Sequence, residues 1–156
     1  MPVAFYTIGH STHGIEEFVG LLRSVGVQLL VDVRTIPRSR RNPQFNREVL
    51  PTTLADFQIG YEHLAALGGL RHKRAMTEEF RAGLDRLRNL GHQSPTAIMC
   101  AEAVWWRCHR RIIADYLMTA DEIVFHIMGG GRVERAEMTQ GAKRESNGIL
   151  TYPALL

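Results

Sequence analysis

Lysine, cysteine and long apolar runs are scarce in this chain of 156 residues. Of its 19 basic residues only Lys73 and Lys143 are lysines, so seventeen are arginines. No apolar run approaches the roughly 20 residues that span a bilayer, and the first residues lack the basic and apolar regions of a signal peptide. We therefore expect a soluble cytoplasmic protein with no membrane partner. The two cysteines are too few for a disulfide framework, and a cytosolic setting should keep both reduced.

The length and composition fit one compact domain that spans residues 1–156. At 45% hydrophobic residues, a chain of this size buries roughly two thirds of its unfolded surface. The formal net charge is only +3, yet the arginine bias favours an anionic partner, because a guanidinium presents a planar fork of donors that suits phosphate and carboxylate. A GC-rich genome combined with solvated arginine faces explains the bias equally well. The composition is also compatible with a homodimer.

Short apolar runs alternate with segments of helical periodicity along most of the chain. Alternating strands and helices predict an α/β fold, a single-domain three-layer sandwich with a mostly parallel, Rossmann-like sheet of about five strands. Residues 133–156 receive no assignment. The strands are expected at 5–8, 28–33, 59–64, 95–99 and 122–128, and the helical faces at 18–25, 51–57, 80–91 and 108–117.

A polar cluster follows each of these strands. Right-handed crossovers bring the carboxyl ends of parallel strands to one edge of the sheet, and open α/β sheets bind ligands in the crevice at that edge. We therefore expect a cleft formed by the clusters at residues 9–11, 32–34, 68–71, 100–102 and 129–132.

The segment after the fourth predicted strand brings together a thiol, a carboxylate, an imidazole and cations. Cys100 is a candidate nucleophile, since a helix amino terminus and nearby arginines stabilise a thiolate; a buried cysteine that ends a strand is the plainer alternative. His109 is a candidate nucleophile or orienting group. Glu102 and Asp32 are candidate general acids or bases, with His10 between them. Simple ion pairing with arginines is equally compatible with both carboxylates.

Potential ligands of a zinc ion are His10, Cys100, Glu102, Cys108 and His109. Their spacing matches no standard zinc finger or zinc ribbon. The sequence therefore predicts no metal site, and it assigns no cofactor.

Residues 34–47 contain five arginines, two prolines and no acidic residue, which predicts an exposed, extended loop. Cations interleaved with polar and aromatic side chains suit phosphate binding and base stacking, so a nucleotide or single-stranded nucleic acid is the expected anionic ligand. A solvated basic loop is the alternative. The candidate ligand-binding residues around the cleft are Ser11, Arg34, Arg38, Ser39, Arg40, Phe45, Gly68, Gly69, Arg71, Arg110 and Gly130.

Several short motifs occur in order along the chain. They are TIGHS (7–11), VDVR (31–34), PRSR (37–40), PQF (43–45), LGG (67–69), CAE (100–102) and CHR (108–110). In these motifs the chain resembles the domain of unknown function 488 family from end to end. The resemblance implies a small bacterial or archaeal α/β protein, and it assigns no activity.

Two functional hypotheses follow from the residues. In the first, the protein is a hydrolase or transferase that acts on a phosphorylated or nucleic-acid ligand in the cleft. In the second, it is a non-enzymatic module that binds nucleic acid or a nucleotide, and the segment around Cys100 only builds the cleft. The sequence does not decide between them.

Overall fold

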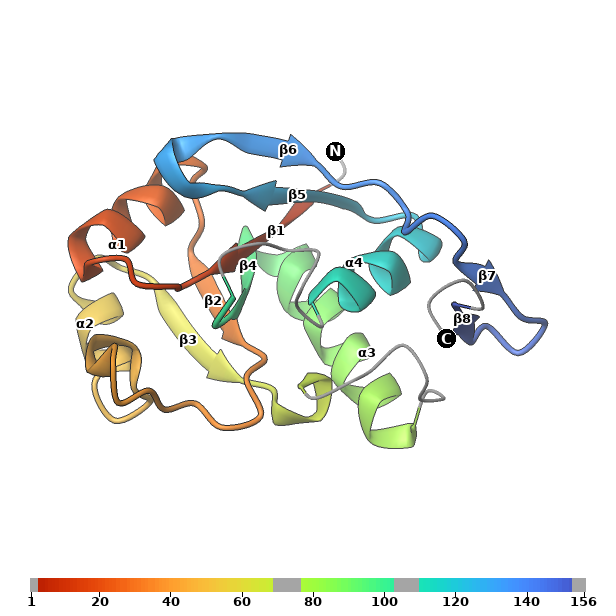
Figure 1. Cartoon of the computed structure of the whole chain (residues 1–156), viewed down its shortest axis with the longest axis horizontal. Coiled ribbons are helices and arrows are strands. Elements are labelled where there is room, and N and C mark those ends of the chain that lie inside the picture. The colour runs from red at the N-terminus through yellow and green to blue at the C-terminus, as the bar shows by residue number, and fades with distance from the viewer. Residues whose placement is uncertain (1–2, 69–76, 103–109, 153–156) are drawn as a thin grey trace.

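A six-stranded sheet forms the centre of the computed structural model, which describes residues 3–68, 77–102 and 110–152 (Figure 1). Its strands are β1 (Ala4–Gly9), β2 (Leu29–Asp32), β3 (Gly60–His63), β4 (Thr96–Cys100), β5 (Ile123–Ile127) and β6 (Val133–Arg135). The α-helices are α1 (Ile15–Ser24), α2 (Leu50–Ala55), α3 (Glu78–Gln93) and α4 (Arg110–Thr119). Short elements are the 3₁₀ helices η1 (Pro43–Phe45), η2 (Ala65–Leu67) and η4 (Gly129–Gly131) and a hairpin of β7 (Lys143–Arg144) with β8 (Leu150–Thr151).

The strands β3–β2–β4–β1–β5 run parallel in that spatial order, and β6 pairs antiparallel with β5. The predicted α/β class and mostly parallel sheet are thus confirmed. The order exchanges β1 and β4 relative to the common dinucleotide-binding arrangement. The sequence does not predict β6, because its three residues are too few to show an alternating pattern.

Helices cover both faces of the sheet (Figure 1). α1 and α2 pack on one face, and α3 and α4 pack on the other. Connections that leave β1 and β2 run toward the β3 edge, whereas those that leave β3 and β4 run back toward β5, and right-handed crossovers place the two groups on opposite faces. The chain therefore leaves the neighbouring strands β1 and β4 toward opposite faces, which is where α/β sheets form a crevice.

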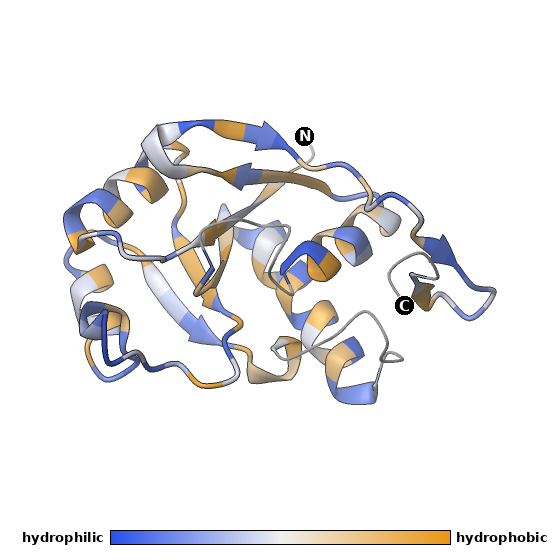
Figure 2. Ribbon diagram, in the orientation of Figure 1, coloured by the Kyte–Doolittle hydropathy of each residue, from blue (hydrophilic) through white to orange (hydrophobic). Residues whose placement is uncertain are grey.

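Alternating side chains of the strands supply two separate cores. Phe5 and Val31 pack with α3 and α4, whereas Ile8 and Leu30 pack with α1 and α2. β4 is buried along its whole length, as expected of a central strand covered on both faces. Figure 2 shows helices α1, α3 and α4 with both hydrophobic and hydrophilic residues, which is typical of half-buried helices. In the described part of the chain, no helix has the length and apolarity to cross a bilayer.

Local signals in the sequence delimit α3. The hydroxyl oxygen of Thr77 accepts a hydrogen bond from the N–H of Phe80 at 3.1 Å, which caps the helix. Glu78 and Glu79 occupy the first turn, where negative charge is favourable. Pro95 lies just beyond the end and cannot continue a helix. β4 begins directly afterwards, so these signals also set the position of β4.

The C-terminal part of the described chain is fastened to α4. The carboxylate of Asp115 accepts hydrogen bonds from the N–H of Thr139 and the hydroxyl of Tyr152, both at 3.0 Å. The N–H of Leu150 donates to the hydroxyl oxygen of Tyr116 at 3.0 Å. Burial raises the pKa of Asp115, an effect that these hydrogen bonds oppose. Buried polar contacts between distant segments thus order a region that the sequence leaves unassigned.

Two glycines allow loops to pack closely at the carboxyl edge of the sheet. A Cβ atom at Gly9, the last residue of β1, would lie 1.6 Å from the carbonyl oxygen of Glu102. A Cβ atom at Gly68 would lie 2.4 Å from the carbonyl oxygen of Val33. The segment after β4 therefore rests directly on the end of β1, and the segment after η2 rests on the chain that follows β2.

We expect Gly9→Ala to lower the free energy of unfolding by about 3 kcal/mol or more, because the backbone at Glu102 must move to admit the methyl group. Gly20→Ala is the matched control, since nothing lies within 4 Å of a Cβ at this exposed position of α1. The control should stabilise the protein by up to about 1 kcal/mol. Urea denaturation measures the free energy of unfolding of each variant. Equal changes in the two variants would contradict close packing at Gly9.

Candidate functional site

A pocket opens at the carboxyl edge of the sheet, where β1, β2 and β4 end. Its volume is about 740 Å³, within the range of small-molecule sites. Residues from three segments line it, namely 10–12 after β1, 34–42 after β2 and 100–102 after β4. The pocket lies where the strand order predicts a crevice.

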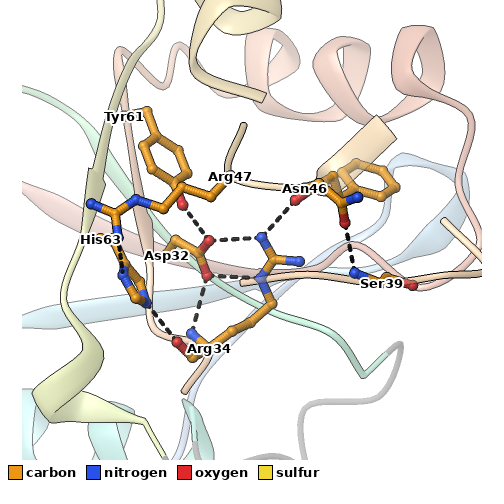
Figure 3. Close-up of polar contacts among 8 residues, drawn as sticks. Asp32, Arg34, Ser39, Asn46, Arg47, Tyr61 and His63 are labelled. Atoms are coloured by element: carbon orange, nitrogen blue, oxygen red, sulfur yellow. Dashed lines mark hydrogen bonds and ion pairs between the residues drawn. The ribbon is translucent and has the colours of Figure 1, made fainter. Parts of the chain in front are cut away.

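A buried ion pair joins Asp32 to Arg34, whose side chain lines the pocket (Figure 3). Nε of Arg34 donates to Oδ1 of Asp32 at 2.9 Å, and Nη2 donates to Oδ2 at 2.7 Å, so the pair is bidentate. The backbone N–H of Arg34 also donates to Oδ1, at 3.0 Å. Asp32, a candidate acid or base from the sequence, is fully buried and does not line the pocket. Its contacts make it a positioning residue for Arg34.

Tyr61, on β3, completes this arrangement. Its hydroxyl donates to Oδ2 of Asp32 at 2.5 Å. Burial raises the pKa of Tyr61 well above its usual value, and the Asp32 carboxylate raises the pKa further, so the hydroxyl remains a donor. No sequence motif contains Tyr61, so the sequence does not predict its place at this site. The signal lies in the parallel register of β2 and β3, which pairs Tyr61 with Leu30 and His63 with Asp32.

Further contacts hold Arg34 in place, but one of its side-chain nitrogens forms no hydrogen bond within the described ranges. Nη2 donates to the carbonyl oxygen of Phe45 at 2.6 Å. Nε2 of His63 donates to the carbonyl oxygen of Arg34 at 2.7 Å, and Nη1 of Arg47 donates to Nδ1 of His63 at 3.3 Å. Nη1 of Arg34 is buried and has no hydrogen-bond partner within the described ranges. In Figure 3 this nitrogen points away from Asp32.

The loop that follows β2 is folded rather than extended, so the sequence-based expectation is wrong here. Oδ1 of Asn46 accepts a hydrogen bond from the N–H of Ser39 at 2.6 Å (Figure 3). The N–H of Arg47 donates to the carbonyl oxygen of Pro37 at 3.0 Å. The last part of the loop forms η1. These bonds hold the loop in one shape at the rim of the pocket.

Three arginines of this loop are exposed near the pocket. Arg38 lines the pocket and forms an ion pair with Glu48 at 2.8 Å, which contributes little because both side chains are more than half exposed. Arg41 also lines the pocket, whereas Arg40 does not. Within residues 3–68, 77–102 and 110–152, neither Arg40 nor Arg41 forms an ion pair. Positive charge thus predominates around the opening.

His10 is the second buried polar side chain at the inner end of the pocket. Its ring stacks on Phe45 with 4.5 Å between ring centroids, and Phe45 packs edge-on against Phe18. We expected Phe45 to stack on a ligand. It is fully buried instead, so its ring supports His10 from the core side.

The contacts of His10 define its protonation. Its Nδ1 donates to the carbonyl oxygen of Ser11 at 2.9 Å. Burial lowers the pKa of His10 below 6.5, an effect that this hydrogen bond opposes and that the charge of Arg34 reinforces. The imidazole is therefore neutral at pH 7, and Nε2 carries a lone pair. Nε2 is buried and has no partner among the residues that the structure describes.

The end of β4 supplies the third wall of the pocket. Cys100 is 1% exposed and disulfide-bonded, which corrects the expectation of reduced cysteines. Sulfur in a disulfide is not a thiolate, so Cys100 is not a nucleophile in this state.

Glu102 is exposed and lines the pocket, which leaves its carboxylate available as an acid or base. Cys108 and His109 lie outside the described residues.

Arg110, expected to bind an anion, is fully buried and does not line the pocket. Its Nη2 donates to the carbonyl oxygen of Glu102 at 3.1 Å, and its Nη1 donates to the hydroxyl oxygen of Thr7 at 3.4 Å. Burial lowers the pKa of Arg110 to about 10. A hydrogen bond of 2.6 Å joins the Thr7 hydroxyl to Nδ1 of His126. These contacts fasten the segment after β4 to β1 and β5.

The structure brings together part of the predicted site. The predicted residues that line the pocket are His10, Ser11, Arg34, Arg38, Ser39, Cys100 and Glu102. Gly130 instead forms an exposed turn between β5 and β6, with φ of 79°. Gly69 and Arg71 are outside the described ranges. Within those ranges, no group of three or more His, Cys, Asp or Glu side chains is placed to hold a metal ion.

A family model described as "Domain of unknown function DUF488" matches residues 14–79 and 72–117. The chain belongs to this family. The DUF488 match runs from the start of α1 through most of α4, so it includes the pocket segments that follow β2 and β4. No curated protein and no solved structure gives a significant match.

Because His126 is buried, we expect the protein to lose stability in acid. Burial lowers its pKa to about 4, and the charge of Arg110 lowers the pKa as well. The unfolded chain, with a pKa near 6.5, binds the proton more readily, so stability is complete above about pH 6.5 and is lost as the pH falls toward 4. Relative to His126→Gln, which does not titrate, the wild type should lose about 2 to 3 kcal/mol between pH 7 and pH 4. Urea unfolding at several pH values measures the free energies of both proteins. A difference between the wild type and His126→Gln that does not change with pH would contradict this prediction.

Proposed function

We propose that the protein is a hydrolase or transferase that acts on a phosphorylated ligand in this pocket. The observation that carries the proposal is a pair of buried atoms, the donor Nη1 of Arg34 and the acceptor Nε2 of His10, which have no partner in the described chain and belong to residues lining one pocket. A buried polar atom without a partner costs roughly 1 to 3 kcal/mol. Such atoms call for an explanation, and a ligand that completes their hydrogen bonds supplies one.

Arg34 is suited to bind the phosphoryl group. Its other side-chain nitrogens are held by Asp32 and Phe45, so Nη1 has a fixed direction before any ligand arrives. A donor that is already oriented in a site of low dielectric stabilises developing negative charge strongly. Arg38 and Arg41 add positive charge at the rim, which raises the local concentration of anions.

His10 is suited to act as the general base. As a water or hydroxyl oxygen attacks phosphorus, Nε2 takes the proton of that oxygen, and the bond from phosphorus to the leaving oxygen breaks. The leaving oxygen takes a proton from solvent, which reaches it at the open part of the pocket, where the exposed Glu102 lies. The charge on the phosphoryl oxygens then lies near Arg34. A neutral imidazole with its other nitrogen bonded to Ser11 is in the correct tautomer for this role.

Ligand binding requires a small adjustment at the inner end of the pocket. Nη1 of Arg34 and Nε2 of His10 are both covered in the structure. A ligand oxygen reaches them only when neighbouring side chains shift outward. The exposed side chains of residues 34–42 are the part that can shift, whereas the backbone of this loop is held by hydrogen bonds and the strand ends behind it are buried.

A non-enzymatic module that binds nucleic acid is the second candidate. The exposed arginines favour it, because Arg40 lies beyond the pocket and extends the positive surface along the loop. A strand that follows this surface would contact several phosphates at once, with strong salt dependence. In that case His10 would not be needed for function.

We expect His10→Asn to lower kcat for p-nitrophenyl phosphate at least about 100-fold, because the general base is lost. The dissociation constant of inorganic phosphate should change less than about twofold, since Arg34 remains. His13→Asn is the matched control: His13 pairs with Glu17 and does not line the pocket, so its replacement should leave kcat unchanged. Because burial lowers the pKa of His10, the wild-type rate should fall at a lower pH than an ordinary histidine base would give.

Two outcomes would contradict this assignment. If His10→Asn keeps its activity and Glu102→Gln loses it, Glu102 is the base. If the wild type turns over no phosphate ester while it binds phosphate and single-stranded oligonucleotide, the protein is a binding module.

A further inference from the structure

We infer that the ligand is a nucleotide unit with a terminal phosphate, either a free nucleotide or the phosphorylated end of a strand. This inference rests on the proposed function, because it names the ligand of the same pocket. Three features of the pocket support it: its size, an exposed apolar side chain at its mouth, and its closed inner end.

The pocket is larger than a phosphate group needs. A phosphate that contacts Nη1 of Arg34 fills only the inner end, and the total volume is about 740 Å³. Sites of this size take organic molecules and usually bury most of the ligand surface. The phosphate must therefore be attached to a larger organic group.

Ile36 indicates the character of that group. Its side chain lines the pocket and is 73% exposed, although its loop is held in place by bonds such as that from the N–H of Arg38 to its carbonyl oxygen at 2.9 Å. An apolar side chain that is fixed at a pocket mouth gains free energy when a flat apolar surface covers it. The guanidinium of Arg41, on the same wall, can stack on an aromatic ring. A nucleobase offers such a surface.

The inner end of the pocket restricts which phosphate can enter. His10, Arg34 and Cys100, at the ends of three neighbouring strands, are 3%, 5% and 1% exposed, so they close the pocket from below. A phosphodiester within a strand would need space for the chain to enter and to leave. Only a terminal phosphate reaches the inner end. Its monoester also carries more negative charge than a diester, which strengthens its bond to Arg34.

Titration calorimetry on the full chain can test this with inorganic phosphate, the ribonucleoside 5′-monophosphates, and a short single-stranded oligonucleotide with and without a 5′-phosphate. At least one nucleotide should bind about tenfold more tightly than inorganic phosphate. The 5′-phosphorylated oligonucleotide should bind about tenfold more tightly than its unphosphorylated form. If the free nucleotide binds more tightly than the phosphorylated oligonucleotide, the ligand is a free nucleotide. If the oligonucleotide binds more tightly, the ligand is the phosphorylated end of a strand.

Ile36→Thr should weaken nucleotide binding about tenfold and leave the affinity for inorganic phosphate unchanged. Val49→Thr is the matched control, because Val49 is a 47% exposed β-branched residue outside the pocket lining, and this variant should bind like the wild type.

The inference is overturned if nucleotides bind no more tightly than phosphate, if the 5′-phosphate has no effect, or if Ile36→Thr leaves nucleotide affinity intact. In each case phosphate binding would still support the proposed function. Failure of inorganic phosphate and all nucleotides to bind would instead overturn the proposed function itself.

Discussion

The buried ion pair of Asp32 and Arg34 is the interaction on which the pocket depends. Removing two charges from water costs several kcal/mol per ion, so such a pair is seldom a net source of stability. Here two donors from the Arg34 side chain, its backbone N–H and the hydroxyl of Tyr61 satisfy the carboxylate. The ion pair instead determines where the Arg34 guanidinium lies. It fixes a guanidinium at the end of β2 with one nitrogen, Nη1, that has no partner among the described residues.

The strand order gives this guanidinium its surroundings. β2, β4 and β1 are neighbours, and the chain leaves β4 toward the opposite face from β1 and β2. A crevice results above three buried strand ends, and Gly9 allows the segment after β4 to approach β1 closely. The stacking of His10 on Phe45 then joins the end of β1 to the loop after β2. Each wall of the pocket is thus tied to a rigid part of the sheet.

The sequence predicts the sheet and the edge that carries the pocket because both depend on local patterns. Apolar runs mark β1 to β5, and the polar clusters that follow them, together with the arginine-rich loop at 34–47, contain most of the pocket lining. Features that depend on tertiary contacts are not predictable in this way. Tyr61 reaches Asp32 only through the register of β2 with β3. Phe45 lies in a polar loop, yet η1 turns its ring into the core.

NMR spectroscopy of ¹⁵N-labelled protein, with the Arg34 side-chain signal assigned through Arg34→Lys, tests the central claim most directly. As inorganic phosphate is added, we expect the Arg34 guanidinium signals to shift and to saturate, because Nη1 gains a partner. Shifts confined to the exposed Arg38, Arg40 and Arg41, with Arg34 unaffected, would show that anions bind only at the rim. That result would contradict the role of the buried pair.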